Sequence, residues 1–344
     1  QAPKNGFFYV IDRETGEFLS GEAFANVTWA TGLTAEGRPI ENPAARALEG
    51  GVHVAPGPNG SHNWNPMSFN PDTGLVYFPV YEHSMLYAVD DEWNYDRRRD
   101  NIGGDFLYSG ETSGEEVPFT GHLVAWDPVA QREAWRVEHP QPLSGGTLST
   151  AAGLVFQGRA DGSFRAYRAG DGVLLWEFNQ ETGIGAAPIT YAVDGTQYVA
   201  VLAGWGGPEV LVNAGLGEGS IGPGRLLVFA LDGDATLPEP LAPLPPIEPP
   251  RFELTVTDSD VEQGRKLFSD YCVACHGIDV RSGGITPDLR RMSAGVHEQF
   301  AEIVLRGSRE HLGMPRFDDV FDEDDVRMIH GYILQRARES VGER

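Results

Sequence analysis

Short apolar runs separated by turn residues dominate the first two thirds of the chain. Phe7-Phe8-Tyr9-Val10-Ile11 is one such run, and Leu75-Val76-Tyr77-Phe78, Leu154-Val155-Phe156 and Tyr198-Val199-Ala200 each follow a turn that contains glycine. Glycine supplies the backbone freedom that tight hairpin turns need. The pattern therefore predicts many short β-strands joined as hairpins.

Two of these segments repeat at a fixed distance. Ala125-Trp126-Asp127 leads to Trp135 and Ala166-Tyr167-Arg168 leads to Trp176, so both the alanine and the second tryptophan recur 41 residues apart. A period near 40 residues with several short strands per copy is typical of β-propeller blades. We expect the repeated tryptophan to fill the gap between neighbouring blades.

Weaker copies flank the two clear ones. Val10-Ile11-Asp12 has the same turn but carries Ser20 where the tryptophan is expected, and Ala230-Leu231-Asp232 ends the series. This makes roughly three and a half blades, fewer than the four to eight of a closed propeller. We expect residues 1–235 to be the later part of a larger propeller; an irregular β-sandwich with chance similarity between two segments is the alternative.

The pattern changes beyond residue 235. Residues 236–256 are rich in proline and predict an extended linker. In residues 257–344 the apolar positions follow a helical period, which predicts one helix capped by Asp258 or Ser259 and a final helix. The apolar or small positions on these helices are Gly264, Leu267, Phe268, Val326, Ile329 and Ile333.

Charge is strongly one-sided, because 50 acidic residues face 26 basic ones and the net charge is −24. Nucleic acid and anionic membrane surfaces would repel this chain, and no apolar run reaches the ~18 residues that cross a bilayer. The acidic surface favours solubility, or steering of a basic redox partner. The N-terminus shows no secretory leader and enters a strand at once, which predicts a start inside a larger structure. A cluster that could steer a partner consists of Asp318, Asp319, Asp322, Glu323, Asp324 and Asp325.

The only two cysteines lie in Cys272-Val273-Ala274-Cys275-His276. Two thiols at this spacing can add to the vinyl groups of a haem while the adjacent imidazole reaches its iron. A redox-active cysteine pair is the rival interpretation, but it expects a βαβ setting and leaves His276 unexplained. The motif predicts a c-type haem with His276 as one axial ligand.

The second axial ligand is less closely specified. Met314, on a loop between the haem motif and the last helix, can offer a thioether to the opposite face of the iron. Met328 lies within the predicted final helix, where core packing is expected, and Met292 lies only 16 residues from His276. Bis-histidine ligation is the alternative to Met314, with three candidates: His297, His311 and His330.

Several separate motifs in one order closely resemble soluble quinohaemoprotein alcohol dehydrogenases, over essentially the whole chain. These are Ala2-Pro3-Lys4-Asn5-Gly6-Phe7-Phe8-Tyr9, His62-Asn63-Trp64, Met67-Ser68-Phe69-Asn70, Gly145-Gly146-Thr147-Leu148-Ser149-Thr150, Leu154-Val155-Phe156-Gln157-Gly158, Ala203-Gly204-Trp205-Gly206-Gly207 and the haem motif.

The resemblance implies the later half of an eight-bladed β-propeller that holds pyrroloquinoline quinone (PQQ) above a calcium ion, followed by an α-helical cytochrome c domain. It implies that Lys4 hydrogen-bonds the quinone oxygens and that Asn63 and Trp64 contact the cofactor. Trp205 is a candidate for the substrate cavity, although blade packing explains it equally well. Without the resemblance, Lys4 would be interpreted as a solvated lysine and Trp64 as a core aromatic residue.

By the same resemblance, the catalytic aspartate, the calcium ligands and an adjacent-cysteine disulfide belong to a preceding half, from the same gene or a second chain. Asp12 lies on a turn, which indicates a structural role. We therefore expect a periplasmic enzyme that oxidises an alcohol at PQQ and passes electrons through haem c to a soluble acceptor such as a blue-copper protein or cytochrome. The sequence does not specify the alcohol. The alternative is a stand-alone electron-transfer cytochrome with a non-catalytic β docking domain.

Overall fold

The computed structural model describes residues 1–97, 101, 103–105, 108–139, 142–204, 223–239, 245–282 and 286–342. These residues form two compact units. The first takes those of 1–92, 103–204 and 223–239, and the second takes 93–97, 101 and 245–342. Residues 93–97 therefore belong with the helical unit, and within it the hydroxyl of Tyr271 donates to the carboxylate of Asp96.

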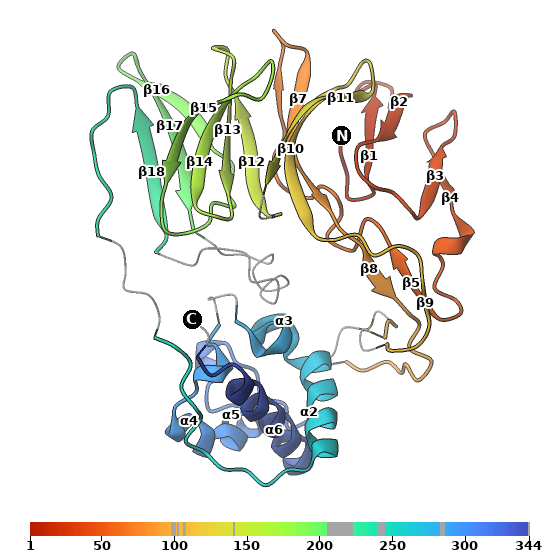
Figure 1. The fold of residues 1–344 in the computed structure, drawn as a ribbon, viewed down its shortest axis with the longest axis vertical. Coiled ribbons are helices and arrows are strands. Elements are labelled where there is room, and N and C mark those ends of the chain that lie inside the picture. Colours follow the sequence, from red (N-terminus) through yellow and green to blue (C-terminus); the bar gives the residue numbers. More distant parts are fainter. Residues whose placement is uncertain are drawn as a thin grey trace. The chain divides into compact units, whose positions relative to one another are not determined.

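The first unit is built from antiparallel sheets of sequence-adjacent strands that stand side by side (Figure 1). The main sheets are β1 (Phe7–Ile11) with β2 (Phe18–Ala23); β6 (Ser68–Asn70), β7 (Leu75–Glu82), β10 (Thr120–Asp127) and β11 (Arg132–His139); β12 (Ser144–Ser149), β13 (Leu154–Arg159), β14 (Ser163–Arg168) and β15 (Leu174–Asn179); and β16 (Ile189–Val193), β17 (Thr196–Ala203) and β18 (Arg225–Ala230).

Two smaller sheets and a short 3-10 helix complete this unit. They are β3 (Ala30–Leu33) with β4 (Pro39–Glu41); β8 (Met85–Tyr87), β5 (Gly51–Val54) and β9 (Thr112–Ser113), in which β5 and β9 run parallel; and η1 (Pro43–Ala45).

The 41-residue repeat is confirmed in the strand registers. Ala125 pairs with Trp135 and Ala166 pairs with Trp176, and in both sheets a bulge follows the alanine directly. The weaker first copy has the same arrangement, because Val10 pairs with Ser20 and a bulge follows Val10. β1, β10 and β14 are therefore equivalent third strands of successive blades.

Separate apolar clusters lie between successive sheets, as expected for blades rather than for one sandwich core. Phe8 packs with Phe78 and Trp126, Tyr77 packs with Trp135 and Tyr167, and a third cluster joins the sheet of β12–β15 to that of β16–β18. Trp135 plugs its gap as predicted: it is buried, and its indole nitrogen donates at 3.0 Å to the carbonyl oxygen of Ala169 in the β14–β15 turn of the next blade. Trp176 does so only in part, because its ring contacts Phe229 of the next sheet but is 39% exposed.

The second unit is helical. Its elements are α2 (Asp258–Tyr271), α3 (Val273–His276), η3 (Ile278–Val280), η4 (Leu289–Arg291), α4 (Ala294–Glu298), α5 (Phe300–Arg306), η5 (Glu310–Leu312) and α6 (Glu323–Glu339). Helices α2 and α6 cross at Gly264, where an added Cβ would lie 2.0 Å from the carbonyl oxygen of Met328. Among the described residues, no helix is both long enough and apolar enough to cross a membrane.

The predicted cap of the first helix is wrong by one or two residues. Thr257, not Asp258 or Ser259, is the N-cap: its hydroxyl accepts from the backbone N–H of Asp260 at 3.2 Å, and the Asp260 carboxylate accepts from the N–H of Thr257 at 2.8 Å. This reciprocal pair needs two side chains three residues apart, which Thr257 and Asp260 provide.

Candidate functional site

The cysteine and histidine residues of the haem motif lie on one helical segment at the end of α2. Cys272 caps α2, and α3 continues at once through Cys275 and His276. The backbone N–H of His276 donates to the carbonyl oxygen of Cys272 at 2.9 Å, and Gly277, at φ 77°, ends the segment. Local helix geometry alone therefore places both sulfur atoms and the imidazole within about one turn.

The imidazole of His276 is buried and oriented by a backbone carbonyl. Its Nδ1 lies 3.4 Å from the carbonyl oxygen of Pro287, which leaves Nε2 available to bind a metal. Burial lowers the pKa of His276, although the contact with Pro287 opposes this effect. The neutral ring that results is the form that binds iron.

The two thiols differ in their surroundings. Cys275 is exposed, whereas Cys272 is partly buried, and burial followed by the nearby Cys275 raises the pKa of the Cys272 thiol to about 12. A thiol with this pKa is protonated near neutral pH and is a weak nucleophile for disulfide exchange. The motif also lies at the junction of α2 and α3, not in the βαβ setting that a redox-active cysteine pair expects.

Apolar side chains surround the motif and fit a flat hydrophobic group such as a haem. Val280, Phe317 and Phe321 are buried in the core cluster of this unit, and Cys272, Leu289, Met292 and Met314 pack against it. An attached macrocycle needs such a wall on both faces, and the axial histidine needs a carbonyl partner. Pro287 supplies the carbonyl partner, and the apolar side chains of this cluster supply a wall beside the motif.

The candidates for the second axial ligand fall into different places. Met314 is half-buried on the loop between η5 and α6 and packs against the core cluster, and its N–H donates to the carbonyl oxygen of Arg309 at 3.3 Å. Met292 also packs against that cluster, whereas Met328 is half-buried within α6. Met314 stays the predicted ligand.

Two of the histidine candidates bind each other. Nδ1 of His297 lies 2.8 Å from Nε2 of His330, and both rings are buried. Phe252 stacks on both rings and Phe300 stacks on His330. The pairing occupies Nε2 of His330, the nitrogen through which a histidine most often binds a metal, but it leaves Nε2 of His297 open. His311 is exposed in η5.

In the first unit, the structure brings the predicted quinone-contacting residues onto adjoining loops. The backbone N–H of Ser61 donates to the carbonyl oxygen of Lys4 at 3.2 Å, and the Lys4 ammonium donates to the carbonyl oxygen of Pro58 at 3.1 Å. Gly60 packs so closely that an added Cβ would lie 2.5 Å from the Cα atom of Lys4. Lys4 is thus held beside the loop that carries Asn63 and Trp64.

His62 belongs to the His62-Asn63-Trp64 motif, but the sequence analysis assigned it no role. Its ring is buried, with Nδ1 2.5 Å from the carbonyl oxygen of Ala2 and Nε2 2.9 Å from that of Asn65. It therefore ties the segment before β1 to the loop before β6. In the sequence, the position of His62 next to Asn63 was the one indication that it has a role at this site.

The neighbouring side chains are presented to solvent. Trp64 is 53% exposed, so its interpretation as a core aromatic residue is wrong, and Asn63 is half-buried. Asp12 has the predicted structural role: its carboxylate accepts from the N–H groups of Glu14 and Thr15 and from the Thr15 hydroxyl, and these bonds lower the pKa of Asp12. Trp205 lies outside the described residues.

Among the described residues, no three His, Cys, Asp or Glu side chains cluster closely enough to hold a metal ion.

Comparison with known proteins agrees with this division. Residues 116–199 match the family model "Glucose/ethanol/alcohol dehydrogenase, beta-propeller domain", and residues 259–333 match "Cytochrome C oxidase, cbb3-type, subunit III". The quinohemoprotein alcohol dehydrogenase ADH IIB of Pseudomonas putida is 45% identical over 98% of this chain and 49% of its own length.

Two solved structures are similar. The quinohemoprotein alcohol dehydrogenase ADHIIG of Pseudomonas putida has a TM-score of 0.87 and 39% identity over 98% of this chain and 51% of its own. The corresponding enzyme of Comamonas testosteroni has a TM-score of 0.82 and 39% identity over 98% of this chain and 50% of its own. The chain therefore belongs with the quinohaemoprotein alcohol dehydrogenases, to which it is related over nearly all of its own length and about half of theirs.

Proposed function

We propose that this chain is the later half of an eight-bladed, PQQ-dependent alcohol dehydrogenase, and that its cytochrome part passes the electrons to an external acceptor. The observation that carries the proposal is an uncovered apolar face on the last sheet of the first unit. One face of that sheet packs on β12–β15 through Val201, Leu227 and Phe229. The opposite face carries side chains that are each 40–64% exposed: Ile189, Tyr191, Val193, Leu202, Leu226 and Val228.

Such a face is what a further blade would cover. The registers place these side chains together, since Ile189 and Val228 both flank Ala200 and Leu202 pairs with Leu226. Burying them would remove several large apolar side chains from water, at roughly 1.5–3 kcal/mol each.

In this proposal, Lys4, Asn63 and Trp64 form one side of the PQQ site. PQQ supplies the oxidising centre that accepts a hydride from the alcohol. The Lys4 ammonium stabilises negative charge on the quinone oxygens, and the exposed Trp64 ring offers a flat surface for an aromatic cofactor. The base that removes the hydroxyl proton and the calcium ligands belong to the preceding half.

The cytochrome part takes up the electrons singly. Cys272 and Cys275 would hold the haem covalently, and His276, through Nε2, and Met314 would ligate its iron. A soluble blue-copper protein or cytochrome in the periplasm is the proposed acceptor. The second candidate function is a stand-alone cytochrome whose β unit serves only for docking. The similarity of nearly the whole chain to quinohaemoprotein alcohol dehydrogenases favours the enzyme.

The test compares this chain alone with this chain co-expressed with a preceding propeller half from a related enzyme. Alone, with PQQ and calcium added, we expect a cytochrome that aggregates and shows no haem reduction by a panel of alcohols, because base and metal ligands are lacking. Co-expression is expected to restore both solubility and alcohol-driven haem reduction, followed by absorbance. Turnover by the isolated chain, or a stable monomer without the other half, would contradict the proposal.

A further inference from the structure

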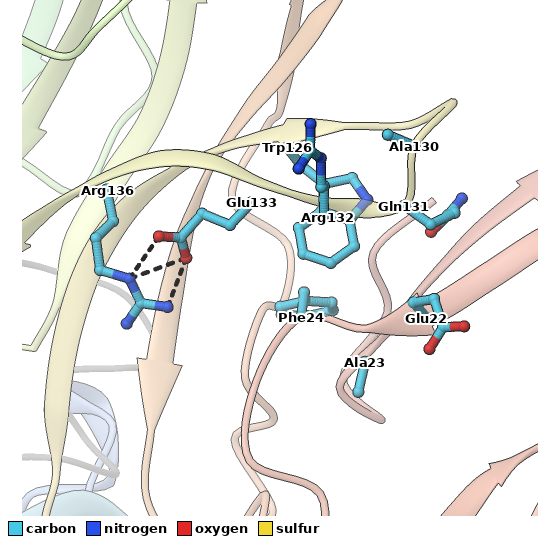
Figure 2. Close-up of a pocket in the computed structure, with 9 residues that line it drawn as sticks. All are labelled: Glu22, Ala23, Phe24, Trp126, Ala130, Gln131, Arg132, Glu133 and Arg136. Carbon is cyan, nitrogen blue, oxygen red and sulfur yellow. Dashed lines mark hydrogen bonds and ion pairs between the residues drawn. The ribbon is translucent and has the colours of Figure 1, made fainter.

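A pocket of about 460 Å³ lies between β2 of the first blade and β10 and β11 of the second (Figure 2). This volume is within the range of small-molecule sites and far above the ~30 Å³ of one water molecule. Lys4, Asn63 and Trp64 are not part of its lining. The lining residues are Glu22, Ala23, Phe24, Trp126, Ala130, Gln131, Arg132, Glu133 and Arg136.

The repeat shows how this blade interface differs from the next. Between the second and third blades, Trp135 packs on Gly172, where an added Cβ would lie 2.7 Å from the indole, and its nitrogen donates to the carbonyl oxygen of Ala169. Between the first and second blades, Ser20 stands at the tryptophan position and Gln131 stands at the position of Gly172.

The Gln131 amide takes over the hydrogen bonds of the missing indole. Its nitrogen donates to the Ser20 hydroxyl at 2.9 Å and to the carbonyl oxygen of Pro128 at 3.0 Å. Pro128 precedes Ala169 by the same 41 residues that separate Ala125 from Ala166. The side chains of Gln131 and Ser20 together occupy less volume than that of one tryptophan, so this substitution leaves some space at the interface.

Gln131 adopts a backbone conformation that residues other than glycine disfavour. It adopts φ 52°, in the left-handed region, where the equivalent turns have Gly16 at 76° and Gly172 at 73°. A side chain other than glycine is strained there, and such strain often marks a functional position.

Two buried polar atoms at the pocket have no hydrogen-bond partner among the described residues. One is the indole nitrogen of Trp126, a residue only 4% exposed, and the other is the side-chain oxygen of Gln131. Figure 2 shows both side chains around the same space, with Phe24 below the indole. One atom is a donor and the other an acceptor, so hydroxyl groups of a ligand could satisfy them.

The charges of the wall are balanced. Glu22, Glu133, Arg132 and Arg136 all line the pocket, and Arg136 already holds Glu133 through bonds of 2.5–2.9 Å. A wall of two acids and two bases does not favour a charged ligand. Charged planar groups and amides do bind hydroxyl groups well, and the aromatic rings of Phe24 and Trp126 offer an apolar surface for C–H groups.

From these observations we propose that the pocket binds a small neutral polyhydroxylated compound, of the size of a monosaccharide or cyclic polyol. Ligand hydroxyls accept from Trp126 Nε1 and donate to Gln131 Oε1, and further hydroxyls reach the charged rim. The site is separate from the proposed quinone site, and the inference does not depend on the proposed enzyme activity.

The probe is myo-inositol, with cyclohexanol as a ring of similar size that carries one hydroxyl. Binding to the complete protein is measured by titration calorimetry and by saturation-transfer NMR, and the site is located in a soaked crystal. We expect saturable binding of myo-inositol in this pocket and none of cyclohexanol. Gln131→Gly should weaken binding about tenfold, the effect of one lost hydrogen bond.

Loss of binding must be separated from loss of folding. Gln131→Gly relieves the left-handed strain, so its unfolding free energy should be unchanged or higher. The double variant Ser20→Trp with Gln131→Gly rebuilds the tryptophan-on-glycine pair of the neighbouring interface and should abolish binding. Asp194→Gly, which relieves φ 49° in the β16–β17 turn, is the matched control and should keep full affinity. Density for ordered water only, or equal affinity of Gln131→Gly and the unaltered protein, would overturn the proposal.

Discussion

Single side chains determine which atoms in the helical unit can bind an iron. His276 is buried, and its Nδ1 faces the Pro287 carbonyl oxygen, so only Nε2 can act as ligand. The His297–His330 bond leaves Nε2 of His297 open, and the half-buried thioethers are those of Met292, Met314 and Met328, of which Met314 is the predicted ligand. The choice between methionine and histidine ligation can therefore be tested at single positions.

Replacing Met314 by alanine is expected to remove the weak long-wavelength absorbance of a sulfur–iron bond. The reduction potential should also fall, because a thioether favours reduced iron. Optical titration of the purified holoprotein measures both quantities. Met328→Ala in α6 is the control and should leave the band in place. An unchanged spectrum in Met314→Ala would instead indicate a histidine ligand.

The His297–His330 pair predicts a pH-dependent stability. Burial, followed by the neighbouring His297, lowers the pKa of His330 from 6.5 to about 4. As the pH falls through 6.5, the unfolded chain takes up a proton that the folded chain refuses, so stability is full above this pH and declines towards pH 4. The decline is on the order of 2–3 kcal/mol.

The measurement is the free energy of unfolding by denaturant between pH 7 and pH 4.5, followed through haem absorbance. His330→Phe, which fits between Phe252 and Phe300, should flatten this pH dependence. The exposed His311→Phe serves as the control. A slope unaffected by His330→Phe would show that other groups cause the acid sensitivity.

At the scale of elements, close backbone approach sets the helix crossing in the second unit. Gly264 of α2 lies against the backbone of Met328 and Ile329 in α6, with no space for a side chain. Val326, Ile329 and Ile333 of α6 lie on the predicted apolar face and are buried. The crossing thus combines a small residue on one helix with an apolar stripe on the other.

Gly264→Ala is expected to lower the free energy of unfolding by about 3 kcal/mol, because its Cβ forces the two helices apart. Gly295→Ala is the matched control: this helical glycine has no atom within 4 Å of an added Cβ. There alanine should raise stability by roughly 0.5–1 kcal/mol. Denaturant unfolding followed at the haem compares the two; equal stability of both variants would contradict the tight crossing.

At the scale of the whole molecule, net charge is the dominant feature for a redox partner. Part of the acidic cluster has a local role, since the Asp322 side chain caps α6 by accepting from the N–H groups of Asp324 and Asp325, and Asp325 completes the capping box. Acids in the first turn also complement the helix dipole. Capping does not involve Asp318, which instead lies 3.5 Å from Arg316.

If the acidic surface also steers partners, electron transfer to a basic c-type cytochrome should slow as salt rises past ~0.1 M, where the screening length is about 10 Å. Stopped-flow absorbance at increasing ionic strength measures this rate. An acidic acceptor of similar potential is the control and should show the opposite trend. A rate independent of salt would leave these acids with a local role only.

The sequence by itself determined the features that depend on neighbouring residues. The haem motif could be identified because thioether attachment and axial ligation need Cys272, Cys275 and His276 side by side. The blade repeat was visible because each copy carries its own turn and its own pair of strands. Even the first copy, which has Ser20 in place of the tryptophan, keeps this strand pairing. The motif order also indicated the family, which the comparisons confirmed.

Only the tertiary structure decided which distant groups meet. The pairing of His297 with His330, the contact of Gln131 with Ser20 across a blade interface and the place of residues 93–97 in the helical unit all join positions far apart in the chain. The exposure of Trp64 to solvent also depends on how distant segments of the chain pack. The physical reason is that turns and covalent motifs depend on short-range geometry, whereas burial and side-chain pairing depend on how whole elements pack.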